Sequence, residues 1–487
     1  MTHLQRNRGN KGESYGDLTA EATSRVEITD PARKRVFTMA ITATDDRDRG
    51  RPSSWSASVD RLASDYDANG YAPRLFVLSA GNIRDANAWA DYPASLSTNL
   101  IHDPGQAWNA LTVGAYTQLS NISEPDAQHY QSIAPVGGLS PFTTTSATWQ
   151  KDWPFKPDIV MEGGNAAQEP GGFACSMPSL SLLTTNYQPT KRLLDACWAT
   201  SASTALAAGV AARIWSEYPT FWPETVRALM VHSARWTPAM LEQHMPGGVS
   251  NTQTRTSLLR HCGYGVPSLD RALWSVSNSL TMVVQDSFHP YRKDQGAIKA
   301  RDMHLHDLPW PRELLEGLDT EVTLRVTLSY FIEPNPGARG NADKYAYQSH
   351  ALRLAIRRPL ETEQDFRARI NAQAALEEDG LPARTAGTDT GWAIGETLRR
   401  RGSLTSDSWT GTAAELANRG QLAIYPAMGW WRNRPRLRRF ERASRYALIV
   451  SIEAPEVKSD LYAAVALAIA QATTGVALRV PIATTTR

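Results

Sequence analysis

Two segments far apart in the chain, one strand-like and one helix-like, constrain its fold most strongly. Residues 75–82 form an apolar run that ends in Ser-Ala-Gly-Asn, which puts Asn82 just after a buried strand. Residues 198–209 consist almost wholly of Ala, Thr, Ser, Leu and Gly, which predicts a buried helix with Ser201 in its first turn. Free N–H groups and the helix dipole favour negative charge there. Because the Asn82 amide can add a second donor, the pair predicts an oxyanion hole and acyl transfer with Ser201 as nucleophile.

The first half of the chain alternates strand-like and helix-like segments. The strands are apolar on both faces, which is typical of a parallel sheet that is covered by helices on both faces. The sequence therefore predicts an α/β fold, with strands at residues 35–42, 75–78, 110–116 and 157–161 and a helix at residues 54–68.

The pattern changes after about residue 275, where apolar and polar residues alternate with a period of two. This predicts an antiparallel β-sandwich, jelly-roll-like and accessory, interrupted by a helix at residues 361–378. We therefore expect two domains, residues 17–275 and residues 285–487. One core of the second domain is expected to contain Leu324, Val326, Leu328, Leu448, Val450 and Ile452.

Several segments in the order found here resemble the subtilisin-like serine peptidases, the subtilases of peptidase family S8. The resemblance covers residues 35–270 and includes the Ser-Ala-Gly-Asn run, the Lys-Pro-Asp strand at residues 156–158, and residues 199–203. This last segment reads Ala-Thr-Ser-Ala-Ser where the family has Gly-Thr-Ser-Met-Ala. Further departures are Glu-Gly-Gly for Ala-Pro-Gly at residues 162–164 and Ala-Leu for Pro-His at residues 205–206.

The resemblance implies a serine endopeptidase, with Ser201 as nucleophile and Asn82 in the oxyanion hole. It also implies that Ile41, Thr42 and Ala43 form the strand edge that pairs with an extended peptide substrate. Such pairing depends on backbone hydrogen bonds, so we expect peptide or protein substrates without a sharp sequence code.

The catalytic Asp and His of the family are absent from their expected places. In subtilases both precede the oxyanion Asn, but the only histidine before Asn82 is His3, which no Gly-Thr follows. Asp45 and Asp46 come after the substrate strand, and no histidine lies between them and Asn82. We therefore expect an N-terminally incomplete subtilase domain, from a truncated or split gene or from a wrongly assigned start, that is inactive alone. The missing Asp and His would come from an upstream segment, either in cis or as a separate N-terminal fragment. The alternative is a non-catalytic pseudopeptidase that binds peptides or acts as a scaffold.

Composition excludes other classes. A formal net charge of +2 predicts no nucleic-acid partner, and the lack of an apolar run of about 20 residues predicts no membrane span. Three cysteines without metal-ligand spacing, Cys175, Cys197 and Cys262, predict a cytoplasmic protein with free thiols, no metal and no cofactor. The Gly-x-Ser-x-Gly motif of α/β-hydrolases is absent around Ser201, which argues against an esterase.

His304 and His306 have an alternate spacing that could place two metal ligands on one face of a strand. No third ligand lies nearby in the sequence, so we expect solvated histidines in a loop.

Overall fold

A computed structural model describes residues 14–43, 50–66, 72–277, 281–335, 346–379, 389–453 and 478–483 of the protein, apart from the side chains of residues 274–277. The chain divides into two units, residues 1–269 and residues 270–487.

The first unit contains a four-stranded parallel sheet of order β1-β2-β3-β5. Its strands are β1 (Val36–Met39), β2 (Leu75–Ser79), β3 (Leu111–Tyr116) and β5 (Ile159–Glu162). Every residue of β2 is buried, as expected for a central strand with covered faces. The predicted α/β class with a parallel sheet is confirmed.

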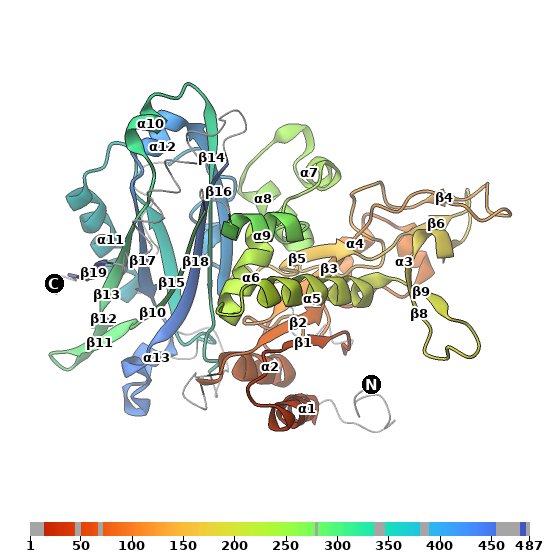
Figure 1. Cartoon of the computed structure of the whole chain (residues 1–487), viewed down its shortest axis with the longest axis horizontal. Coiled ribbons are helices and arrows are strands. Elements are labelled where there is room, and N and C mark those ends of the chain that lie inside the picture. Colours follow the sequence, from red (N-terminus) through yellow and green to blue (C-terminus); the bar gives the residue numbers. More distant parts are fainter. Residues whose placement is uncertain are drawn as a thin grey trace. The chain divides into compact units, whose positions relative to one another are not determined.

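Helices cover both faces of this sheet (Figure 1). Helix α2 (Ser54–Ser64) packs on Phe76 and Leu78 of β2 through Trp55, Val59 and Ala63. Helix α5 (Ala199–Glu217) lies against all four strands, and its Thr200 is hydrogen-bonded to Ser79. Side chains alternate between the faces of a strand, so α2 and α5 lie on opposite faces of β2.

Shorter elements complete the first unit. The helices are α1 (Tyr15–Thr29), α3 (Ala86–Ala90), α4 (Ser95–Thr98), α6 (Pro223–His232), α7 (Pro238–His244) and α8 (Thr252–Cys262), followed by α9 (Leu269–Ser277). The short strands are β4 (Gln131–Ser132), β6 (Ala166–Gln168), β7 (Ala174–Ser176), β8 (Leu182–Thr185) and β9 (Leu194–Cys197).

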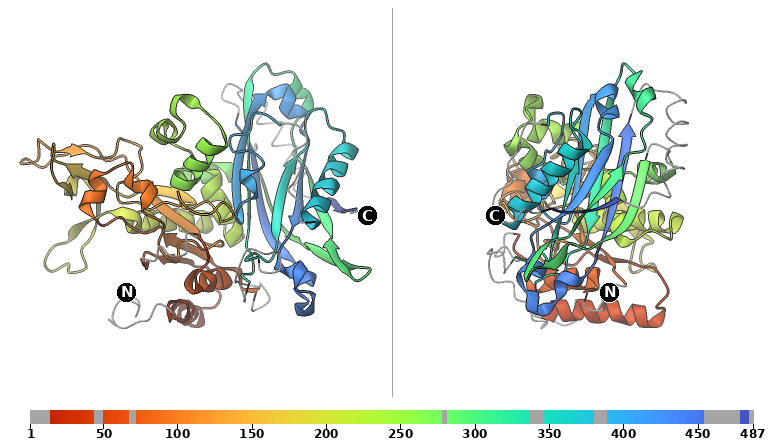
Figure 2. Two further views of the ribbon diagram at one scale, coloured as in Figure 1. Left: turned by 180° about the vertical axis from the view of Figure 1, so that it is seen from behind. Right: turned by 90° about the vertical axis from the view of Figure 1, so that its left-hand side faces the viewer.

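The second unit contains two four-stranded antiparallel sheets, which Figure 2 shows from two sides. One has the order β10-β18-β14-β16, from β10 (Thr281–Phe288), β18 (Ser444–Glu453), β14 (Glu321–Tyr330) and β16 (Leu404–Thr412). The other has the order β15-β17-β13-β19, from β15 (Ala351–Ile356), β17 (Gln421–Ala427), β13 (Asp302–Asp307) and β19 (Leu478–Pro481). The hairpin β11 (Tyr291–Asp294) and β12 (Ala297–Ala300) and the helices α10 (Arg312–Glu316), α11 (Glu363–Glu378), α12 (Ala413–Ala417) and α13 (Trp430–Asn433) complete it.

The buried residues of the β10-β18-β14-β16 sheet agree with the period-two pattern. Strands β14 and β18 pair in a register that sets Leu324 opposite Ile452, Val326 opposite Val450, and Leu328 opposite Leu448. All six side chains are buried. The prediction that they share one core is confirmed, because a period of two puts one set of residues on one face.

The prediction that His304 and His306 are solvated in a loop is wrong. Both lie on β13 and are buried, and both contact the hydroxyl of Tyr446 on the opposite sheet. Met303 and Leu305 alternate with them and pack under α11. Because side chains alternate along a strand, the two histidines point to the opposite face, between the two sheets. There the Tyr446 hydroxyl is their hydrogen-bond partner.

Within the described ranges, the helices are all too short or too polar to cross a membrane.

Candidate active site

Ser201 lies in the first turn of α5. The helix follows β9 directly, with Trp198 as its N-cap, and the Ser201 side chain is partly exposed. The first helical residue, Ala199, has a φ of 69°, a left-handed conformation that glycine adopts more readily. Its N–H donates to the carbonyl of Gly163 over 2.6 Å. This bond fixes the start of the helix to the turn after β5.

Asn82 is held against the same helix start. The Oδ1 atom of Asn82 accepts the backbone N–H of Thr200 at 3.0 Å and the Thr200 hydroxyl at 2.5 Å. The Thr200 hydroxyl also lies 3.0 Å from the carbonyl of Gly81 and 2.7 Å from Ser79 Oγ. Thr200 is fully buried. The structure thus brings Asn82 to the residue directly before Ser201.

These bonds also fix the orientation of the Asn82 amide. Because Oδ1 faces Thr200, the Nδ2 group is turned away from it. Among the described residues, neither Asn82 Nδ2 nor Ser201 Oγ makes a hydrogen bond. The N–H of Ser201 belongs to the first turn of the helix, where N–H groups have no partner within the helix. The Asn82 Nδ2 group, the Ser201 N–H and the Ser201 hydroxyl are therefore available at the start of α5.

The predicted substrate residues Ile41, Thr42 and Ala43 begin two residues after the end of β1, which is an edge strand of the described sheet. All three are partly exposed. The N–H of Ala43 donates to the carbonyl of Asp103 at 2.9 Å, and Ile41 packs against the core under α2.

Sequence patterns do not single out two further residues of the site. The sequence favours a packing or capping role for Thr200, although its place beside Ser201 is an available signal. His102 contacts Thr42, with 3.3 Å between Nδ1 and Oγ1. A Cβ on Gly81 would lie 2.4 Å from His102 Cγ, so this ring packs directly on the residue before Asn82. No local motif marks His102, because tertiary folding alone brings it to Gly81.

None of the histidines in the described residues is hydrogen-bonded to Ser201. His261 contacts Ser97 instead, with 3.1 Å between Nε2 and Oγ. Burial, with the charge of His261 added, lowers the pKa of His244 to about 3. A base for Ser201 is therefore not present among the contacts of the described residues.

The carboxylate of Glu162, the last residue of β5, stabilises the turn that follows this strand. Glu162 accepts the N–H of Gln118 at 2.6 Å and that of Gly164 at 2.8 Å. Across the ranges that the structure describes, no three His, Cys, Asp or Glu side chains gather as metal ligands.

The Lys-Pro-Asp segment is part of the core. Lys156 Nζ lies 2.6 Å from Asp158 Oδ2 and 3.0 Å from the carbonyl of Ala110, and Asp158 also accepts the N–H of Thr112 at 2.7 Å. Burial lowers the pKa of Lys156, although Asp158 opposes this shift. These bonds connect β3 to the segment that enters β5.

The fold and this arrangement define a class: an α/β protein with a parallel sheet, a serine in the first turn of a buried helix, and an asparagine amide fixed beside it. The family model described as "Subtilase family" (Peptidase_S8) matches residues 4–265, more than half of the chain. The chain belongs to the subtilase family, a family of serine-type peptidases.

Individual relatives are more distant. "Uncharacterized protein y4bN" of Sinorhizobium fredii (strain NBRC 101917 / NGR234) is 27% identical over 338 residues, which cover 66% of this chain and 69% of that protein. A solved structure of a protease from Pseudoalteromonas arctica is 16% identical with a TM-score of 0.28 and covers 49% of this chain and 50% of its own. The MycP3 protease from the type VII (ESX-3) secretion system is 16% identical with a TM-score of 0.29, over 55% of this chain and 62% of its own. This chain thus spans between half and two thirds of these two solved structures.

Proposed function

We propose that this chain carries the nucleophile and the oxyanion hole of a subtilisin-like serine endopeptidase. Ser201 is the nucleophile, and the Asn82 Nδ2 group and the Ser201 N–H are the oxyanion donors. The observation that carries the proposal is the pair of bonds from Thr200 to Asn82 Oδ1, because they hold the amide beside the helix start by its oxygen and leave its N–H groups for a substrate oxygen. Membership of the subtilase family supports it.

The chemistry follows from these positions. Ser201 Oγ loses its proton to a base and attacks the peptide carbonyl carbon, and the carbonyl oxygen becomes an oxyanion. Donors that already point at this oxygen stabilise it more in the transition state than in the ground state. The base then protonates the leaving amine, and water hydrolyses the acyl-enzyme. The substrate chain would pair with the backbone at residues 41–43, as an added strand on the edge of β1.

The base is the part that this chain needs from elsewhere. A serine hydroxyl is a weak nucleophile without a neighbouring base, and base help contributes about 10²–10⁴-fold. Since no described histidine bonds to Ser201, we assign the Asp and His to a separate polypeptide segment. The chain alone is then nearly inactive. The three cysteines are free, which supports a cytoplasmic location.

A fluorophosphonate probe with peptide mapping tests the proposal. We expect little labelling of the chain alone, labelling at Ser201 after addition of a subtilase segment that carries the Asp and His motifs, and none in Ser201→Ala. Ready labelling of the chain alone would contradict the need for another segment. His102 would then be the first candidate for the base, and His102→Gln would test it.

The second candidate function is a peptide-binding pseudopeptidase. The left-handed Ala199 at the helix start, where the family has glycine, favours it. This alternative would be established if the chain binds peptides but Ser201 is not labelled by the fluorophosphonate, whichever segment with Asp and His motifs is added.

A further inference from the structure

A cavity of about 230 Å³ lies in the second unit and is lined by residues of that unit. Leu354, Ala355 and Ile356 of the edge strand β15 form its floor, and α11 contributes Arg369. The segment of residues 389–399 encloses it and pairs through Trp392 with Trp409 of β16, the edge strand of the other sheet. The cavity is therefore built at one edge of the sandwich.

The carboxylates around the cavity already have partners. Asp389 accepts two bonds from Arg419, at 2.6 and 2.9 Å, and a third from the Trp392 indole at 2.9 Å. Glu396 lies 2.7 Å from Arg400 Nη2. Hydrogen bonds from Arg419 and Trp392 outweigh burial and lower the pKa of Asp389, so it is ionised and occupied at neutral pH.

Arg399 lacks such hydrogen bonds, although among the described residues it forms an ion pair with Asp407. Its side chain is nine-tenths buried, and within the described chain its Nε and Nη1 atoms have no hydrogen-bond partner. The guanidinium lies over the Trp392 ring, 4.3 Å from the centroid. Its Nη1 is 3.6 Å from Asp407, whose oxygens already accept the N–H groups of residues 394, 395 and 408. A buried guanidinium without hydrogen bonds is costly, because its donors have lost water and gained no acceptor.

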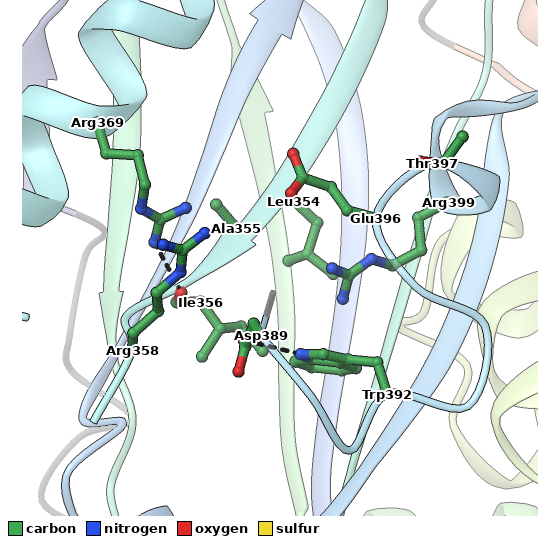
Figure 3. Close-up of a pocket in the computed structure, with 10 residues that line it drawn as sticks. All are labelled: Leu354, Ala355, Ile356, Arg358, Arg369, Asp389, Trp392, Glu396, Thr397 and Arg399. Atoms are coloured by element: carbon green, nitrogen blue, oxygen red, sulfur yellow. Dashed lines mark hydrogen bonds between the residues drawn. The ribbon is translucent and has the colours of Figure 1, made fainter. Parts of the chain in front are cut away.

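Figure 3 shows the Arg399 guanidinium entering the cavity near Leu354 and Trp392, with Arg358 and Arg369 on the opposite side. Arg369 is held there by Glu361, at 2.7 and 2.9 Å, and by the carbonyl of Ile356 at 3.0 Å. Arginines thus face the cavity from both sides above an apolar floor.

The charges indicate a monoanion. The cluster of lining residues and their ion-pair partners contains one more arginine than carboxylates: Arg353, Arg358, Arg369, Arg399, Arg400 and Arg419 against Glu361, Glu377, Asp389, Glu396 and Asp407. One carboxylate balances this excess, whereas a phosphate dianion would exceed it. A carboxylate also matches the planar guanidinium fork, and the aliphatic floor beside the Trp392 ring suits an apolar body.

We propose that this cavity binds a small organic monoanion, one carboxylate on an apolar body, with Arg399 as its main ligand. The site is separate from the proposed peptidase chemistry. The carboxylate accepts the free donors of Arg399, and the apolar part covers Leu354, Ile356 and Trp392.

Calorimetric titration of the full chain with N-acetyl-leucine tests the proposal. N-acetyl-leucinamide is the probe without charge, and inorganic phosphate is the probe for a different anion. We expect saturable binding of N-acetyl-leucine, at least tenfold weaker binding of the amide, and no competition by phosphate at equal concentration. Absence of saturable acid binding, equal binding of the amide, or preferred binding of phosphate would each overturn the proposal.

Variants locate the binding. We expect Arg399→Gln to weaken N-acetyl-leucine binding at least tenfold, while Arg436→Gln, which removes the same charge from an exposed position, leaves it unchanged. If Arg399→Gln fails to fold, Thr397→Glu is the variant that tests the site, because Thr397 is exposed and lines the cavity. Its carboxylate would repel the ligand while Arg399 is kept. Wild-type affinity in either folded cavity variant would refute the assignment.

Discussion

At the scale of single residues, the site depends on how Thr200 holds Asn82. The sequence alone indicates Asn82 and Ser201, because a strand end and a helix start are visible as local patterns. It does not indicate that Thr200 donates twice to Asn82, or that His102 packs on Gly81, because both contacts join residues distant in the chain. In the proposed mechanism, Thr200 is thus a positioning residue for the oxyanion hole.

Thr200→Val tests this role against Thr204→Val. Both threonines are buried, and the Thr204 hydroxyl donates only to the carbonyl of Thr200, at 2.6 Å. We expect either variant to lose about 1–3 kcal/mol of unfolding free energy, as for a buried polar group left without its partner. Only Thr200→Val is expected to slow Ser201 labelling in the reconstituted enzyme, because only it removes one of the two bonds that hold the Asn82 amide. Equal labelling rates in both variants would show that Thr200 has no positioning role.

At the scale of elements, the sequence predicts those with a strong local periodicity and misses those whose place depends on tertiary contacts. The sequence predicts a buried helix with Ser201 in its first turn, and α5 runs from Ala199 to Glu217. The strand β13 is not predicted because Met303 and Leu305 alone are a weak alternating signal, and the two histidines that alternate with them suggest a solvated loop. The position of α5 depends on Gly163, where a Cβ would lie 2.4 Å from Ala115 Cβ and 2.8 Å from Ser203 Oγ.

Gly163→Ala is therefore expected to push α5 away from β3. We expect a loss of about 1–3 kcal/mol in unfolding free energy, as for an overpacked core, and slower labelling of Ser201. Gly209→Ala is the matched control on α5, since its Cβ would meet nothing within 4 Å. It is expected to gain about 0.5–1 kcal/mol from helix propensity. Urea denaturation gives both values, and an unchanged Gly163→Ala would refute the close contact.

At the scale of the whole molecule, both units bury neutral histidines. Burial, together with charge repulsion from His304, lowers the pKa of His306 to about 4. Burial alone lowers the pKa of His350 to about 3. Asp286, Asp307 and Tyr446 also lie around His306 and its neighbour His304, and the two carboxylates oppose the shift. The two units follow from two periodicities in the sequence, whereas the burial of the histidines depends on how the sheets face each other.

This burial predicts acid lability. Below pH 6.5 the unfolded chain binds a proton at each such histidine and the folded chain does not, so stability falls as the pH drops from 6.5 towards 4. The slope is about 1.4 kcal/mol per pH unit for each histidine. Hydrogen exchange of the peptide that covers residues 302–307, across a urea series at pH 7, 6 and 5, measures it. We expect His306→Gln to reduce the slope by one proton, and an identical slope in this variant would contradict the buried neutral state.

The most direct test of the central claim is the rate of fluorophosphonate labelling at Ser201 in Asn82→Ala, with the Asp and His segment supplied. The claim is that the Asn82 amide stabilises the oxyanion formed at Ser201. We expect labelling to slow by about 10²–10³-fold, the loss known for one such donor in subtilisin, a member of the same family. Peptide binding is expected to stay unchanged, because the interaction is made only in the transition state. Labelling at the wild-type rate, or at a residue other than Ser201, would contradict the claim.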